Sequence, residues 1–147
     1  MRKTLKLNLP LDSEDAIEGI GISTGLSDYR LAWTLNNAFQ WQLQFSEETL
    51  QIPVKKSKNL STFHFHKFIS DEEKVSVFLI KNKQEGKAFF EDYPQFDYVM
   101  FFKDNFSLNL EQLTSSLREL DPIIAAFRCT SANFSNSKFL IFEPSHE

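Results

Sequence analysis

Polar and apolar residues alternate along several short segments of the chain, which is the pattern of β-strands with one buried face. The alternation predicts strands over residues 3–9, 41–45 and 50–54, and a weaker apolar run predicts one over 16–23. The polar residues 46–49 stand between two of these strands. We therefore expect residues 41–45 and 50–54 to form a hairpin.

Two further segments are apolar on both faces. Residues 74–81 and 96–102 place large apolar side chains at odd and even positions alike, as strands in the middle of a sheet do. We expect the first of them to form a second hairpin with residues 62–69. Short terminal strands are predicted over 123–129 and 138–142.

One helix is predicted directly after the weak strand. Ser27 suits the N-cap, Asp28 lies in the first turn where negative charge is favourable, and an apolar stripe follows at Leu31, Leu35 and Phe39. This spacing is typical of a helix that lies on a sheet.

A second helix is predicted to begin after Asn109, which is a capping residue, and to end before Pro122. Its apolar stripe consists of Leu110, Leu113, Leu117 and Leu120. If the strands on either side of this helix are parallel, residues 96–129 form a right-handed crossover unit.

Together these elements predict an α+β fold. Residues 1–147 form a single two-layer domain, a mostly antiparallel sheet of about six to seven strands with two helices on one face. The helices cover only that face, whereas the central strands are apolar on both. A second copy of the chain is the simplest cover, so we expect a homodimer that associates over the other face.

The composition is typical of a packed domain and limits the kinds of partner that we expect. The 147 residues include 16 Phe but only 4 Gly and 5 Pro, which is typical of an aromatic core. A net charge of −4 disfavours nucleic acid as a partner. Cys129 is the only cysteine, and no apolar run resembles a signal peptide or membrane span, so we expect a cytoplasmic protein without membrane association or cofactor.

Two histidines are weak candidates for a metal site. His64 and His66 are two positions apart on a predicted strand, so both rings point to one face, as a metal-binding pair requires. No third ligand stands at a recognised spacing. Two surface or rim histidines are therefore the favoured interpretation, and metal binding is the alternative.

The start of the first helix is the stronger candidate for a binding site. Asp28, Tyr29 and Arg30 lie where spare backbone N–H groups can hold an anion, although no phosphate-loop motif accompanies them. The alternative is that Ser27 and Asp28 only cap the helix, while Tyr29 packs and Arg30 lies along apolar surface.

Asp97 and the neighbouring Tyr98 complete this candidate site. Asp97 lies within an apolar strand, where a carboxylate needs a partner, and Arg30 is the partner that we expect. Such a pair is more often architectural than catalytic. No motif for nucleophilic or paired-carboxylate catalysis is present in the sequence, so we predict no catalytic residue.

The chain resembles the IPExxxVDY family of uncharacterised bacterial proteins. Residues 22–36 are similar to the family's signature around a D-Y-R-L helix start, and residues 90–98 to its eponymous motif. The V-D-Y part is matched by Phe96, Asp97 and Tyr98, whereas Phe-Glu-Asp replaces the I-P-E part. The chain's ending, from residues 124–127 to 137–142, is similar as well.

The resemblance implies a cytoplasmic housekeeping protein of Bacteroidetes-type bacteria, with genes for fatty-acid synthesis, ribonuclease III and pyruvate kinase as frequent neighbours. It assigns no activity and no catalytic residue. We therefore expect a non-enzymatic protein-interaction or self-associating domain. The alternatives are a small-molecule-binding or enzymatic domain with a pocket near Asp28–Arg30, and an RNA-associated accessory protein.

Overall fold

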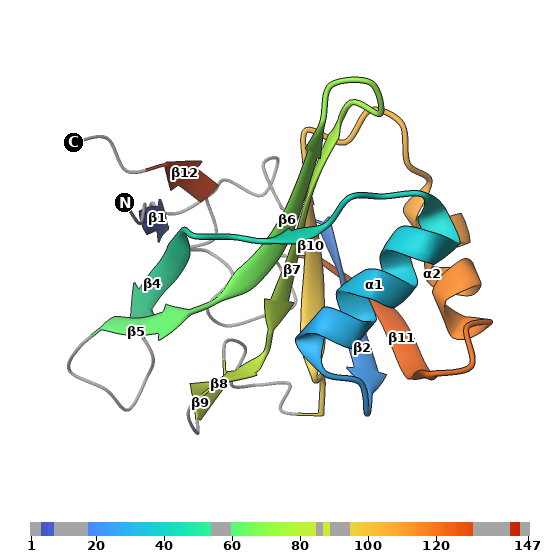
Figure 1. The fold of residues 1–147 in the computed structure, drawn as a ribbon, viewed down its shortest axis with the longest axis horizontal. Coiled ribbons are helices and arrows are strands. Elements are labelled where there is room, and N and C mark those ends of the chain that lie inside the picture. Colours follow the sequence, from blue (N-terminus) through green and yellow to red (C-terminus); the bar gives the residue numbers. More distant parts are fainter. Residues whose placement is uncertain are drawn as a thin grey trace.

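A computed structural model describes residues 4–7, 18–53, 60–84, 87–88, 95–130 and 142–144 of the chain. It has an α+β architecture in which two helices lie on the same side of a six-stranded antiparallel sheet (Figure 1). The predicted fold class is therefore confirmed. Within the described residues, neither helix is long and apolar enough to cross a membrane.

The six-stranded sheet has the strand order β11-β2-β10-β7-β6-β3. Every neighbouring pair in it is antiparallel. Its strands are β2 (Glu18–Thr24), β3 (Gln44–Phe45), β6 (Phe65–Ser70), β7 (Val75–Lys81), β10 (Tyr98–Lys103) and β11 (Ile123–Thr130). The two segments predicted to be central, β7 and β10, do lie in the middle, and β6 and β7 form the predicted hairpin.

The remaining strands form two smaller ladders. A four-stranded sheet has the order β12-β1-β4-β5, and it contains the one parallel pair among the described ladders, β1 with β4. Its strands are β1 (Thr4–Leu7), β4 (Thr49–Pro53), β5 (Leu60–Phe63) and β12 (Phe142–Pro144). A two-stranded ladder joins β8 (Lys83–Gln84) to β9 (Lys87–Ala88). Most of the strand predicted over 138–142 lies outside the described residues.

The helices form where the caps and stripes predict them. Helix α1 (Asp28–Phe39) begins after Ser27, whose hydroxyl accepts from the backbone N–H of Arg30, and α2 (Leu110–Arg118) begins after Asn109. Strands β10 and β11 are both antiparallel to β2 and hence parallel to each other, with α2 between them in sequence. The crossover that the sequence predicted conditionally is therefore present.

The helices bury one face of the sheet in a single apolar core. Leu31 and Leu35 of α1 and Leu117 of α2 are fully buried against it. The sheet contributes alternate residues of its strands, as the pleat requires, except where the register of β11 shifts between Ile123 and Ala125. These sheet residues are Ile20, Ile22, Val75, Val77, Leu79, Tyr98, Met100, Phe102, Ile123 and Ala126.

The centre of the opposite face is buried as well, within the single chain. Phe78 and Ile80 of β7 are 5% and 0% exposed, and Val99 and Phe101 of β10 are 0% and 1% exposed. Figure 1 shows the four-stranded sheet on this side, away from the helices. The open apolar face that we expected is absent among these residues, and the predicted homodimer loses the surface on which it was based.

The hairpin predicted from residues 41–45 and 50–54 is wrong. Strand β3 pairs with β6 in one sheet, whereas β4 pairs with β1 and β5 in another. Between them, Ser46 and Glu48 are only 3% and 8% exposed, and the Ser46 hydroxyl accepts from the Glu48 backbone N–H at 3.0 Å. Polar residues that resembled an exposed turn are thus a buried crossing from one sheet to the other.

Candidate functional site

The first turn of α1 is capped by its own side chains. The Ser27 hydroxyl accepts from the N–H of Arg30 at 3.4 Å, and the Asp28 carboxylate accepts from the N–H of Tyr29 at 2.9 Å. The Leu31 N–H donates to the Ser27 carbonyl, which begins the helical ladder. These groups are therefore not spare donors for an anion, and the capping alternative describes this turn.

Asp97 binds backbone and not Arg30. One carboxylate oxygen of Asp97 accepts from the Thr24 N–H at 2.9 Å, and the Asp97 N–H donates to the Ile22 carbonyl at 2.9 Å. No ion pair joins Arg30 to Asp97 within the described part of the chain, and Arg30 is exposed. The expected pair is therefore wrong, because the last residue of β2 supplies the donor instead.

Tyr98 links the same turn to the sheet. Its hydroxyl donates to the Leu26 carbonyl at 2.7 Å, and its ring is 2% exposed. Burial, together with the nearby carboxylates of Asp28 and Asp97, raises the pKa of Tyr98 to about 12. The phenol thus stays protonated and serves as a structural donor. The predicted residues Asp28, Asp97 and Tyr98 do lie close together, but around an internal hydrogen-bonded turn.

The Tyr29 side chain does not join this hydrogen-bonded turn but contacts an aromatic cluster that it forms with Phe45, His64 and His66. It is 63% exposed and stacks on Phe45 with ring centroids 5.9 Å apart. His64 stacks on the same Phe45 ring at 5.8 Å. His66 meets Tyr29 and Phe45 edge to face, both at 5.4 Å. The two histidines therefore share a face, as predicted, but their neighbours are aromatic.

The histidines differ in exposure. His64 is exposed, whereas His66 is 3% exposed and its burial lowers the pKa of the imidazole, an effect that the Asp28 carboxylate partly offsets. No group of three or more metal-ligating side chains occurs among the residues that the structure describes. Within these residues, the structure therefore adds no third ligand to His64 and His66.

A shallow groove of about 390 Å³ lies beside the first turn of α1. Its walls come from four separate segments of the chain. Its lysines are Lys81, the last residue of β7, and Lys83, the first of β8. The lining residues are Asp28, Tyr29, Phe45, His64, Lys81, Lys83 and Gln84. Two of the predicted site residues, Asp28 and Tyr29, therefore border a surface groove, together with the predicted His64.

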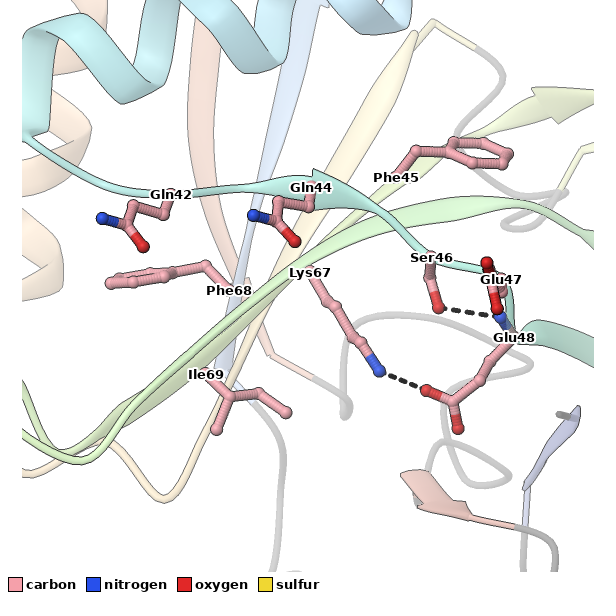
Figure 2. A pocket seen from close by; sticks show the side chains of 9 residues that line it. All are labelled: Gln42, Gln44, Phe45, Ser46, Glu47, Glu48, Lys67, Phe68 and Ile69. Atoms are coloured by element: carbon pink, nitrogen blue, oxygen red, sulfur yellow. Dashed lines mark hydrogen bonds and ion pairs between the residues drawn. The ribbon is translucent and has the colours of Figure 1, made fainter. Parts of the chain in front are cut away.

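A larger groove of about 530 Å³ lies on the other side of β3 (Figure 2). Gln42 and Gln44 present their amides to it from one segment, and Lys67 and Ile69 face it from β6. Phe45 points away from these side chains and belongs to both grooves. The complete lining is Gln42, Gln44, Phe45, Ser46, Glu47, Glu48, Lys67, Phe68 and Ile69.

The charged pair in the larger groove is architectural. The Lys67 ammonium donates to the Glu48 carboxylate, whose side chain is 11% exposed (Figure 2). Glu48 also belongs to the buried crossing between the two sheets. A carboxylate held in this way needs its partner in order to be buried at all, so the pair ties the crossing to β6.

Sequence reasoning missed the residues that gather around β3. Phe45, Lys81, Lys83 and Gln84 are distant from Tyr29 in sequence, and no motif connects them. The one available signal was the spacing of Tyr29 and Trp33, which puts two aromatic side chains on the face of α1 opposite its apolar stripe.

Comparisons of the chain with family models, with curated proteins and with solved structures find no match. The resemblance to the IPExxxVDY family therefore stays a prediction that rests on the motifs quoted above.

Proposed function

We propose that this domain binds another protein through an exposed row of aromatic side chains and catalyses no reaction. The row, which we call the aromatic ridge, consists of Trp33 and Tyr29 on α1, Phe45 on β3 and His64 before β6. The observation that carries the proposal is the exposure of three large rings, two of them on one face of α1 and the third stacked on Tyr29. Trp33 is 69%, Tyr29 63% and Phe45 41% exposed.

The ridge combines a pair of aromatic side chains on one helix face with a stacked group of three rings. Trp33 follows Tyr29 by four residues, which places the two side chains on one face of α1. Tyr29 stacks on Phe45, and Phe45 stacks on His64. Scattered exposed apolar residues are ordinary on protein surfaces, whereas a joined group of aromatics is typical of an interaction site. Tyrosine and tryptophan also dominate the energetic centres of protein interfaces.

The chemistry of the buried titratable groups supports a non-catalytic role. Burial raises the pKa of the Cys129 thiol to about 12, so almost no thiolate nucleophile exists near neutral pH. Tyr98 is likewise held protonated, and its hydroxyl donates to a backbone carbonyl. These groups are arranged for packing and hydrogen bonding, not for proton transfer to a substrate.

The proposal assigns the partner to a different protein. Self-association was expected over the second face of the six-stranded sheet, and the centre of that face is buried within the chain. A homodimer that forms over the ridge is a separate outcome, which light scattering at increasing protein concentration detects as a doubled mass. A cytoplasmic location belongs to the same proposal, because it rests on the single cysteine and the resemblance.

A second candidate function is supported by the groove beside Asp28. Its volume of about 390 Å³ is within the range of small-molecule sites, and Lys81 and Lys83 would suit an anionic ligand. Thermal unfolding in the presence of phosphorylated metabolites and acyl thioesters tests this function. A bound ligand at one hundred times its Kd stabilises the fold by about 2.7 kcal/mol, which raises the Tm measurably.

The experiment that tests the protein-binding function is site-specific photo-cross-linking in the source cells. A benzophenone amino acid replaces Trp33 in one variant and Phe106 in the control, because Phe106 is equally open at 79% exposure but lies in the loop before α2. We expect a discrete adduct from position 33 that is missing from position 106. The adduct should disappear when Tyr29→Ser and Phe45→Ser are added. Identical adducts from both positions, or none from position 33, would contradict the proposal.

A further inference from the structure

The groove of about 390 Å³ places two lysines at one end of the aromatic ridge. Lys81 and Lys83 line it together with Tyr29, Phe45 and His64 of the ridge. Both lysines are exposed, and within the described ranges neither forms an ion pair. Their positive charge is local, because the chain as a whole carries a net charge of −4.

Asp28 is the one acidic residue in the lining of this groove. Its carboxylate is engaged with the N–H of Tyr29 and lies at the positive end of α1, where the helix dipole offsets its charge. The groove therefore contains two lysine charges and one carboxylate whose negative charge the helix dipole already offsets. The groove favours a negatively charged group next to the aromatic surface.

The length of the ridge suits a short extended segment. One helical turn of about 5.4 Å separates Trp33 from Tyr29, and the ring centroids continue at 5.9 Å to Phe45 and 5.8 Å to His64. The whole row is on the order of 15 Å long, which corresponds to roughly five residues of extended chain. A small molecule in the groove alone would leave Trp33 uncovered.

Two backbone positions at this end of the sheet are already occupied by side chains and are closed to an added strand. The side-chain amide of Gln84 already accepts from the His64 N–H at 2.8 Å and donates to the His64 carbonyl at 3.0 Å. The amide of Asn36 holds both backbone groups of Leu43 in the same way. We therefore expect recognition to come mainly from side chains on the ridge and the lysines.

We infer that the partner binds by an extended acidic segment, with apolar or aromatic side chains on the aromatic ridge and carboxylates at Lys81 and Lys83. This inference rests on the proposed function and adds the chemistry of the partner to it. Single-stranded nucleic acid is the competing partner, because bases can also stack on exposed rings such as Trp33 and Tyr29, and the test separates the two.

The test uses a random copolymer of glutamate and tyrosine as the probe, with polyglutamate and oligouridylate as comparators. Fluorescence reports binding, because Trp33 is 69% exposed and Trp41 is 6% exposed. We expect the copolymer to bind more tightly than either comparator. The double variant Lys81→Gln/Lys83→Gln should weaken copolymer binding roughly fivefold and reduce its dependence on salt.

The matched control removes the same charge from the other end of the central strands. Lys74 precedes β7 and Lys103 ends β10, so the variant Lys74→Asn/Lys103→Gln should bind the copolymer as the unmodified chain does. Equal weakening in both double variants would overturn the inference, because only net charge would then matter. Tighter binding of oligouridylate would overturn it as well.

The cross-linking experiment separates this inference from the proposed function. One outcome is that position 33 still yields its adduct while the Lys81→Gln/Lys83→Gln variant binds the copolymer as tightly as the unmodified chain does. In that case the ridge binds a partner, but the inference that this partner is an acidic segment is wrong. If position 33 yields no adduct, the proposed function fails and the inference falls with it.

Discussion

The side-chain amide of Asn36 binds both backbone groups of Leu43. Its oxygen accepts from the Leu43 N–H at 2.8 Å, and its nitrogen donates to the Leu43 carbonyl at 3.1 Å. The amide thus takes the position of a neighbouring strand at the short edge of the six-stranded sheet. It connects α1 to the segment that leads into β3, and so it positions Phe45 relative to Tyr29.

Replacing Asn36 by alanine should destabilise the fold. The Leu43 side chain is buried, and its backbone groups would lose their partners, which costs about 1–3 kcal/mol. Urea unfolding of Asn36→Ala measures this loss. The control is Asn37→Ala, because the Asn37 amide donates to the Trp33 carbonyl on the exposed surface of the same helix. That change should stay within about 0.5 kcal/mol of the unmodified chain.

Gly21 should tolerate no side chain. A Cβ atom at this position would lie 2.3 Å from the Phe96 ring, so Gly21→Ala forces the ring or the strand to move. We expect a loss of about 1–3 kcal/mol, as for other overpacked cores. A Cβ atom at Gly25 meets nothing within 4 Å. Calorimetry that finds Gly21→Ala as stable as Gly25→Ala would contradict the packing described for β2.

The Asp97 carboxylate should matter for stability, whereas Arg30 should not. Asp97→Ala removes the acceptor of the Thr24 N–H and should cost about 1–2 kcal/mol, because that donor is part-buried. Asp97→Asn keeps an acceptor and should cost less. Arg30→Gln should leave the midpoint of urea unfolding unchanged. If Arg30→Gln lost as much unfolding free energy as Asp97→Ala, the result would support the ion pair that the sequence suggested.

The stability of the fold should fall as the pH drops below about 6.5, because of His66. Burial lowers the pKa of His66 from its ordinary 6.5, so the unfolded chain binds a proton at a higher pH than the folded chain does. Between these two pKa values the unfolded state binds more protons, and stability therefore rises with pH. The full contribution is present above about 6.5 and is lost as the pH falls towards the lowered pKa.

Urea unfolding at pH 7.5 and pH 5 measures this dependence. The variant His66→Leu should flatten it, since it removes the group that titrates. The variant His64→Gln is the control, because it removes an exposed histidine and keeps His66. The same pH dependence in His66→Leu as in the unmodified chain would show that other groups cause it.

The local features of this fold could be read from the sequence, because they depend on neighbouring residues. Ser27 caps α1, and its apolar stripe follows from a period of 3.6 residues. Strands β7 and β10 lie in the middle of the sheet because their side chains are apolar on both faces. The β6–β7 hairpin needs only a short polar turn between two strands.

Only the tertiary structure decided which distant segments meet. Strand β3 pairs with β6 and not in the expected hairpin, and Asp97 accepts from the Thr24 N–H instead of pairing with Arg30. The centre of the second sheet face is buried within the chain. The aromatic ridge likewise joins α1, β3 and the start of β6. Alternation and spacing record which side of an element is apolar, but many partners satisfy that requirement equally well. The choice among them depends on the packing of the whole chain.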